Sequence, residues 1–191
     1  QTPIEPYLVN HVRTADLVVL AFDGSSDDAP DETLNLFQQF DARKTLLSQN
    51  TCYDEDDFTK LRVQTLLAVT RSDDEDSAIR EFLLKENWPR DIPVIHTELQ
   101  NQSSCAALRR AIYDSLGLIR VYTKTPGKTA VYEEPFAIPS GSTIDVLAER
   151  VHHDFVERLK FARIWGEEGH DGQQVGRDHV LHEGDMVELH A

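Results

Sequence analysis

Apolar runs alternate with amphipathic segments through the first 116 residues of the chain. Three apolar runs have the length of β-strands: residues 17–22, 64–69 and 92–96. Each is followed by a segment whose apolar side chains recur at helical spacing: residues 31–49, 75–87 and 103–116. This β-α-β-α-β-α order predicts an α/β fold, with three parallel strands joined by crossover helices.

Details of these segments refine the prediction. Ser103 and Ser104 can cap the third helix, and Gly117 can end it. On the second helix, three apolar side chains share one face: Ile79, Phe82 and Leu83. Residues 50–59 are polar and acidic, and we expect them to form a solvated loop.

After Gly117 the pattern becomes that of a small α+β unit. Strands are expected at residues 119–124, within 135–143, at 161–165 and at 186–190, with a hairpin at 170–176. A short helix is expected at residues 144–151, with Ile144, Leu147 and Val151 facing the sheet. Their expected partners are Val121, Phe136, Ile138, Ile164 and Val187. The domains predicted are therefore residues 1–116 and 117–191.

Composition and charge exclude several classes of protein. Apolar residues make up 40% and charged residues 28%, which is typical of a globular protein. The longest apolar run, residues 17–22, is too short to cross a membrane. The two cysteines have neither metal nor redox spacing, which favours a cytoplasmic protein with reduced thiols. The net charge of -15 argues against a broad nucleic-acid-binding surface, so any RNA contact would have to be local.

Four stretches of the second half resemble the TGS domain, a β-grasp fold. They are "LIRVYTKTPGK", "PFAIPSGSTIDVLAERVHHDF", "LKFARIWG" and "QQVGRDHVLHEGDMVELH". Among TGS proteins, they are most similar to the developmentally regulated GTP-binding proteins of the Obg-related class. The resemblance spans residues 118–190 and implies that residues 117–191 are a TGS domain. It also implies an interaction with the ribosome, RNA or a protein.

The first half then resembles the C-terminal half of a Ras-like P-loop GTPase domain. The phosphate-binding loop, GxxxxGK followed by Ser or Thr, does not occur in the chain. No Asp-x-x-Gly element precedes the strand at residues 17–22. Because the chain begins at Gln1 with what looks like the interior of a longer sequence, we expect it to be the C-terminal portion of a GTPase switch. The intact parent is expected to use GTP or GDP and Mg²⁺.

The turn "TRSD" stands where GTPases carry Asn-Lys-x-Asp to read guanine. The resemblance implies four residues near the base: Thr70, Arg71, Asp73 and Thr97. The Asp73 carboxylate can accept hydrogen bonds from N1–H and the exocyclic amine of guanine, and the Arg71 methylenes can cover the ring. The alternative is an ordinary capped turn, because Ser72 and Asp73 are favourable N-cap residues. Glu98 would repel a purine carbonyl, so the loop is expected to be weakened.

Two consequences follow for the chain by itself. Without the phosphate-binding loop it should not hydrolyse GTP, and no nucleotide or metal is expected to bind it tightly. The strand at residues 17–22 would have an open edge, which self-association, an upstream fragment or residues 3–12 should pair or cover. No membrane partner is expected. The competing hypothesis is a non-catalytic β-grasp interaction module with a degenerate nucleotide site.

A possible RNA contact is limited to one group of basic residues in the second half. The group consists of Lys124, Lys128, Arg158, Lys160 and Arg163. A solvated surface is the alternative for this group. Six of the eight histidines follow residue 150, but their spacing does not indicate a metal site.

Overall fold

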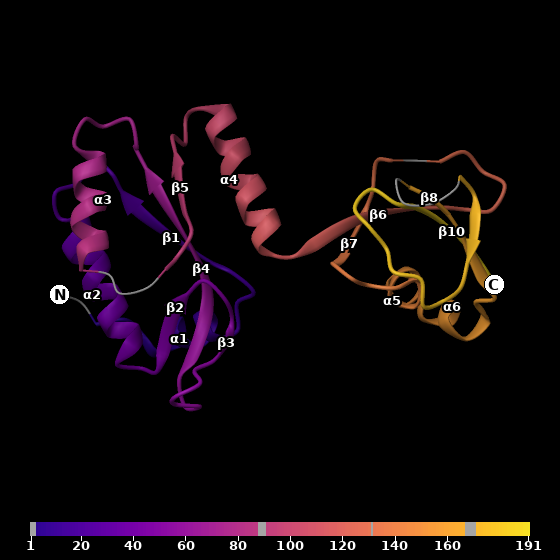
Figure 1. Cartoon of the computed structure of the whole chain (residues 1–191), viewed down its shortest axis with the longest axis horizontal. Coiled ribbons are helices and arrows are strands. Elements are labelled where there is room, and N and C mark those ends of the chain that lie inside the picture. The colour runs from indigo at the N-terminus through magenta and orange to yellow at the C-terminus, as the bar shows by residue number, and fades with distance from the viewer. Residues whose placement is uncertain (1–2, 88–90, 131, 167–170) are drawn as a thin grey trace. The chain divides into compact units, whose positions relative to one another are not determined.

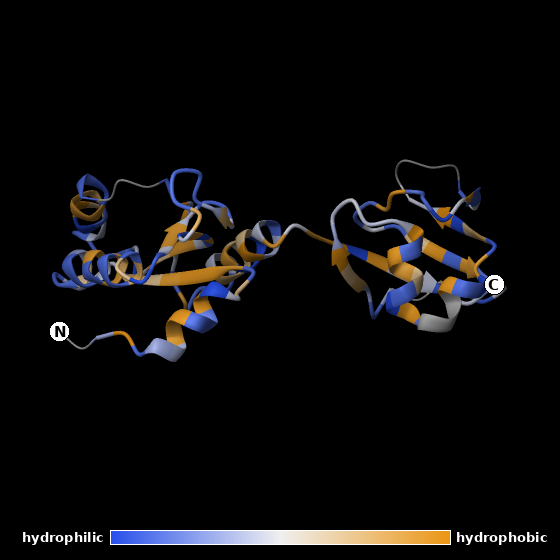
Figure 2. Ribbon diagram, turned by 90° about the horizontal axis from the view of Figure 1, so that it is seen from below, coloured by the Kyte–Doolittle hydropathy of each residue, from blue (hydrophilic) through white to orange (hydrophobic). Residues whose placement is uncertain are grey.

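The computed structural model describes residues 3–87, 91–130, 132–166 and 171–191. The chain forms two compact units: unit 1 spans Gln1–Leu116 and unit 2 spans Gly117–Ala191. In both units the strands are mostly hydrophobic and the connecting segments are mostly hydrophilic (Figure 2). Each unit has its own cluster of buried apolar side chains. Among the described residues, no helix is both long and apolar enough to cross a bilayer.

Unit 1 is an α/β unit built around one long strand (Figure 1). Its elements are α1 (Pro6–Arg13), β1 (Val18–Asp23), α2 (Ala29–Asp41), β2 (Thr45–Ser48), β3 (Cys52–Tyr53), β4 (Leu61–Thr70), α3 (Ser77–Glu86), β5 (Val94–Thr97) and α4 (Gln102–Ser115). Strand β4 pairs in parallel with β1, β2 and β5, and antiparallel with β3. The predicted parallel sheet of β1, β4 and β5 is thus confirmed, with β2 and β3 added to it.

The helix predicted at residues 31–49 is too long. Helix α2 ends at Asp41, and Thr45–Ser48 is strand β2. Lys44, between them, has a φ of 59°, which lies in the left-handed region and breaks the helix. Thr45 and Leu47 are then buried on alternate positions of β2, which pairs with the first half of β4. The apolar spacing of residues 45–48 is compatible with either a helix or a strand, and pairing with β4 makes this segment a strand.

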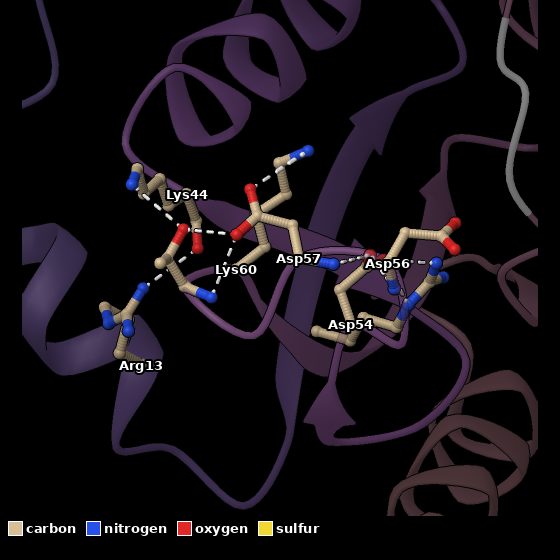
Figure 3. A network of polar contacts seen from close by, with 8 residues as sticks. Arg13, Lys44, Asp54, Asp56, Asp57 and Lys60 are labelled. Atoms are coloured by element: carbon tan, nitrogen blue, oxygen red, sulfur yellow. Dashed lines mark hydrogen bonds and ion pairs between the residues drawn. The ribbon is translucent and has the colours of Figure 1, made fainter.

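The segment at residues 50–59 is more ordered than a solvated loop, so that prediction is wrong in part. It contains β3, and Asp54 in it is only 6% exposed. One carboxylate oxygen of Asp54 accepts two hydrogen bonds from Arg62, at 2.6 and 3.1 Å. The other accepts from the backbone N–H groups of Asp56 and Asp57 (Figure 3). These contacts close the turn, and β4 begins at Leu61, before the predicted start.

Helix α3 turns its apolar face outward. Ile79, Phe82 and Leu83 share a face, as predicted. These residues are 58%, 58% and 47% exposed, respectively. Leu84 and Glu81 are buried instead. Burial alone would raise the pKa of Glu81, but hydrogen bonds from Lys85 and His96 outweigh burial and hold this pKa below its ordinary value.

The outer edge of β1 is open in the described part of unit 1. Strand β1 pairs with β4, and Val19 is 42% exposed. Helix α1 covers part of the same core, because Val9 is buried in it and Ile4 and Val12 pack against it. Residues 3–12 therefore cover part of the core of unit 1. Pairing of the β1 edge with a neighbouring chain or an upstream fragment stays a prediction.

The described part of unit 2 is a mixed sheet with two helices. Its elements are β6 (Leu118–Lys124), β7 (Phe136–Pro139), α5 (Ile144–Val151), α6 (His153–Arg158), β8 (Phe161–Trp165), β9 (Gln173–Val175) and β10 (Met186–His190). The strand order is β7-β6-β10-β8-β9. Strands β6 and β10 are parallel, and the other pairs are antiparallel.

The core of unit 2 has the predicted composition. Ile144 and Leu147 of α5 are fully buried against Val121, Ile138, Ile164 and Val187, and Phe136 and Val151 pack at the border. The predicted hairpin at 170–176 is present as β9 paired with β8, although His170 lies outside the described residues. Helix α6 was not predicted. Unit 2 therefore has the β-grasp arrangement that the resemblance implied.

Candidate nucleotide-base site

A pocket of about 790 Å³ lies where strands β4 and β5 end. Its lining consists of Thr70, Arg71, Asp73, Glu98, Leu99, Gln100 and Asn101. The two strands are parallel neighbours, so the loops that follow them meet at one edge of the sheet. Ligands of open α/β sheets bind at this carboxyl edge. Three of the four residues predicted near a base, Thr70, Arg71 and Asp73, thus share the wall of one pocket.

Thr70 joins the pocket to the neighbouring strand. Its hydroxyl donates a hydrogen bond to the Phe22 carbonyl at 3.1 Å, and its own carbonyl accepts from the Gly24 N–H at 2.8 Å. A Cβ on Gly24 would lie 2.7 Å from that carbonyl and 2.5 Å from the Ser77 hydroxyl. Glycine is therefore required for β1 to approach this closely. Thr70 therefore ties the end of β4 to the end of β1 through both its side chain and its backbone.

Arg71 is held by a carboxylate from the same neighbouring strand. Its guanidinium Nη2 lies 2.7 Å from Oδ2 of Asp23, the last residue of β1. The other oxygen of Asp23 accepts from the N–H and the hydroxyl of Ser25. These bonds from Ser25, together with the charge of Arg71, outweigh burial and hold the pKa of Asp23 below its ordinary value. Asp23 is therefore ionised at neutral pH.

The acids of the loop after β4 divide into bound and open ones. Arg80 donates to the Asp74 carboxylate and to the Gly24 carbonyl, both at 2.7 Å, and pairs with Asp27 at 2.8 Å. The hydrogen bond from Arg80 holds the pKa of Asp74 below its ordinary value. Among the described residues, no hydrogen bond or ion pair engages the Asp73 carboxylate, which lines the pocket.

The opposite wall is the loop between β5 and α4. Asn101 caps α4, because its side chain accepts from the N–H groups of Ser103 and Ser104. The cap predicted at Ser103 and Ser104 is therefore displaced to Asn101. The Glu98 N–H donates to the Ser104 hydroxyl at 2.8 Å, so this donor is not offered to the pocket. Leu99 is 64% exposed and gives this wall an apolar surface.

Thr97 lies beneath this wall. It is fully buried, and its hydroxyl accepts from Ser104 at 3.3 Å. Its role at the base stays a prediction. Asp23, Gln100 and Asn101 were not among the residues predicted for the site. Asn101 carried a usable signal, since Asn is a strong N-cap residue before an amphipathic segment. Asp23 and Arg71 are far apart in sequence, and only the β1–β4 register brings them together.

Unit 2 carries a second feature of chemical interest on the sheet face opposite its core. We call this the aromatic face, and it consists of Tyr122, Lys124, Tyr132, Phe161, Arg163, Trp165, Glu188 and His190. Tyr122 and Tyr132 pack edge to face with centroids 5.1 Å apart, and Phe161 stacks on His190 at 4.4 Å. The Lys124 ammonium lies 4.0 Å from the Trp165 ring centroid.

The charges on the aromatic face are partly compensated. Lys124 pairs with the buried Glu188 at 2.8 Å, and His190 lies 2.7 Å from the same carboxylate. The hydrogen bond from Lys124, followed by that from His190, holds the pKa of Glu188 below its ordinary value. Arg163 is exposed on β8, opposite Glu188 in the register. Of the predicted basic group, Lys124 is thus bound within the sheet face, whereas Arg163 is open to solvent.

Comparison with known proteins identifies the second unit. Residues 119–191 match the family model described as TGS domain. A GTP-binding protein of Methanocaldococcus jannaschii is 39% identical over 83 residues, which cover 43% of this chain and 21% of that protein. The developmentally-regulated GTP-binding protein 1 homolog of Dictyostelium discoideum is 33% identical over 116 residues, covering 59% of this chain and 30% of the relative.

A solved structure supports the fold of the whole chain. The YchF GTPase of Schizosaccharomyces pombe superposes with a TM-score of 0.60 at 11% identity, covering 100% of this chain and 76% of that protein. At this identity the likeness concerns the fold alone. Residues 119–191 of unit 2 therefore form a TGS domain, and the chain is similar over part of its length to proteins named as GTP-binding proteins. More particularly, it is related to the developmentally regulated GTP-binding proteins, and the matched regions span less than a third of the curated relatives described here.

Proposed function

We propose that unit 1 supplies the base-binding side of a guanine-nucleotide site in an Obg-related, cytoplasmic GTPase switch. The observation that carries this proposal is the Asp73 carboxylate. It lines the pocket at the carboxyl edge of the sheet, while Arg80 holds its neighbour Asp74. A free carboxylate in a pocket bordered by Leu99 suits a flat ring that carries hydrogen-bond donors on one edge.

The chemistry of guanine matches this wall. Guanine offers N1–H and a 2-amino group side by side, and one carboxylate can accept from both. Adenine has an acceptor at N1 and no 2-amino group, so the same carboxylate would repel it. Leu99 and the Arg71 methylenes can contact the ring faces. Selection against adenine therefore rests on Asp73, and ring contact rests on the two flanking side chains.

The same geometry sets a low affinity. The Glu98 N–H is already bonded to Ser104, and the acidic residue Glu98 lines the pocket, so Glu98 offers no donor to the guanine carbonyl. GTP or GDP and Mg²⁺ belong to the proposed activity of an intact parent, and we assign none of residues 1–191 to the phosphates or to the metal. In the described residues, no group of three or more His, Cys, Asp or Glu side chains could hold a metal ion. We therefore propose that the chain by itself binds the base weakly and does not hydrolyse GTP.

Exchange of Asp73 for Asn tests the proposal. Xanthine keeps N1–H but carries a carbonyl in place of the 2-amino group, so an amide donor suits xanthine and a carboxylate suits guanine. In ¹⁵N NMR titrations of the whole chain, we expect guanosine to perturb the wild type more than xanthosine does. Asp73→Asn should reverse this order. Asp76→Asn is the control, because Asp76 belongs to the same loop but does not line the pocket.

Equal perturbation by guanosine, xanthosine and adenosine would refute guanine reading. In that case the alternative of a non-catalytic interaction module would stand. This alternative needs the second unit to bind a partner, and the aromatic face is the feature that favours it.

We further propose that the TGS domain contacts unpaired RNA, on the ribosome or free, through the aromatic face. Rings on adjacent strands can stack with unpaired bases, and exposed Arg163 can contact a phosphate. The net charge of the chain is -15, so binding must depend on this local surface and be sensitive to salt.

Binding of fluorescently labelled single-stranded RNA at several salt concentrations tests this second proposal. Arg163→Ala should weaken binding and reduce the salt slope by about one. Trp165→Leu should weaken binding by about 1–3 kcal/mol without changing that slope. Arg177→Ala, which removes a cation paired with Asp145, is the control. Equal effects of Arg177→Ala and Arg163→Ala would reject the aromatic face as the contact.

A further inference from the structure

Arg71 has more than one carboxylate within reach of its loop. It lines the pocket together with Asp73 and Glu98, both of which are acids. Its side chain is 66% exposed, and its backbone has a φ of 50°, in the left-handed region that non-glycine residues seldom adopt. The pocket lining thus holds two other acids with which an exposed arginine could pair. Arg71 pairs instead with Asp23, outside the pocket lining.

Asp23 is built to hold this arginine. One of its oxygens is fixed by the Ser25 N–H at 3.0 Å and the Ser25 hydroxyl at 2.9 Å, which leaves the other directed to Arg71. The backbone beneath is fixed as well, because Gly24 bonds to the carbonyl of Thr70, the residue before Arg71. The hydrogen bonds of Ser25 and Gly24 thus fix the position of the Asp23 carboxylate relative to the loop after β4.

We propose that Asp23 is a positioning residue for base binding, which acts by occupying the Arg71 guanidinium. The ion pair keeps the arginine charge away from Asp73, so that the Asp73 carboxylate remains free to accept from a base. It also holds the arginine side chain along the pocket wall. The inference about base binding rests on the proposed function, whereas the exchange of ion-pair partners can be observed without any ligand.

The first measurement uses the ligand-free chain. Carbon-13 NMR of the side-chain carboxyl groups reports the ion pairing of Asp73 and Glu98 directly. In Asp23→Asn, the released guanidinium should pair with a pocket acid, and the carboxyl resonance of Asp73 or Glu98 should shift. The double variant Asp23→Asn/Arg71→Leu should show no such shift when it is compared with Arg71→Leu alone. Asp114→Asn, which breaks an exposed pair with Arg110, should leave both resonances unchanged.

The second measurement is a guanosine titration of the same variants. Asp23→Asn should weaken binding by a factor of about 1.5 to 5, the range expected from the loss of one exposed ion pair. In the Arg71→Leu background, Asp23→Asn should cause no further loss, because no guanidinium remains to occupy Asp73. A purely structural role of Asp23 would instead weaken binding in both backgrounds.

The outcomes separate the two claims. Unchanged Asp73 and Glu98 resonances in Asp23→Asn, or a loss of affinity that persists in the Arg71→Leu background, would overturn the role of Asp23. Absence of guanosine-selective perturbation in the wild type would refute the proposed function. Even then, the ligand-free carboxyl shifts decide whether Asp23 keeps Arg71 from the pocket acids.

Discussion

Helix α5 of unit 2 and helix α3 of unit 1 both carry an apolar stripe, but α5 buries its stripe whereas α3 exposes it to solvent. In α5, Ile144 and Leu147 are fully buried against a five-stranded sheet. In α3, Ile79 and Phe82 are each 58% exposed. The TGS domain covers one sheet face with its own helices. Among its described residues, unit 1 leaves apolar surface on α3 and an open backbone edge on β1.

The inward side of α3 explains the difference. Ser77 is buried next to Gly24, where the β1 loop approaches too closely for a larger side chain. Glu81 is buried because Lys85 and His96 bind its carboxylate. Close approach, ion pairing and the burial of Leu84 thus decide which face of α3 turns inward, and Ile79, Phe82 and Leu83 are left for solvent or a partner. Apolar spacing alone identifies a helix but not the direction in which it faces.

The largest expected effect contrasts the two stripes directly. Leu147→Ala should destabilise unit 2 by about 2–5 kcal/mol, because it opens a cavity in a closed core. Phe82→Ala should change the stability of unit 1 by no more than about 0.5 kcal/mol, since the side chain is largely exposed. Urea unfolding of the whole chain, followed by amide NMR signals of each unit, measures both. Comparable losses would mean that α3 is packed more closely than the structure indicates.

The next largest effect concerns the buried ion pair of unit 2. Glu188→Ala leaves Lys124 partly buried without its carboxylate, and should destabilise unit 2 by about 2–4 kcal/mol. Asp114→Ala removes an exposed pair with Arg110 in unit 1 and should cost about 0.5 kcal/mol. The same urea experiment compares them. A small effect of Glu188→Ala would show that Trp165 alone can hold the Lys124 ammonium.

The pH dependence of the stability of unit 2 tests the Glu188–Lys124 ion pair in a second way. Lys124 lowers the pKa of Glu188 in the folded state. The ion pair therefore stabilises unit 2 at pH values above the ordinary glutamate value of 4.5, and this contribution is lost as the pH falls through the lower, folded-state value. Glu188→Gln should accordingly be less stable than the wild type at pH 7 and approach it in acid. A stability difference that stays constant from pH 7 to pH 3 would contradict this assignment.

The smallest effect concerns the open edge of β1. If this edge pairs with a second chain, sedimentation velocity should show self-association that increases with concentration. Val19→Lys should weaken the association about tenfold, because an edge lysine opposes strand pairing. Val146→Lys, at an exposed position of unit 2, should not affect it. A wild type that stays monomeric at high concentration would exclude self-pairing of this edge.

Much of the fold followed from local patterns, and the misses have identifiable causes. The α5 core was predictable because each apolar residue there packs within a closed unit. The extra strand β2 was missed because the apolar residues of Thr45–Ser48 continue the helical spacing of α2. The left-handed backbone of Lys44, which ends the helix before this segment, was not visible in that spacing. In the site, "TRSD" indicated Thr70, Arg71 and Asp73. The partnership of Arg71 with Asp23 depends on the β1–β4 register, which no local pattern contains.

In the proposed function, this chain supplies the base side of a guanine site, and none of its residues is assigned to the phosphates. Calorimetric titration of the whole chain with GDP and ADP, together with a phosphate-release assay on GTP, tests it most directly. One carboxylate and two ring contacts support an affinity no better than roughly millimolar. We therefore expect no measurable heat at micromolar concentrations and no release of phosphate. Micromolar, guanine-selective binding that disappears in Asp73→Ala would contradict the expected weakness and make "TRSD" a complete specificity loop.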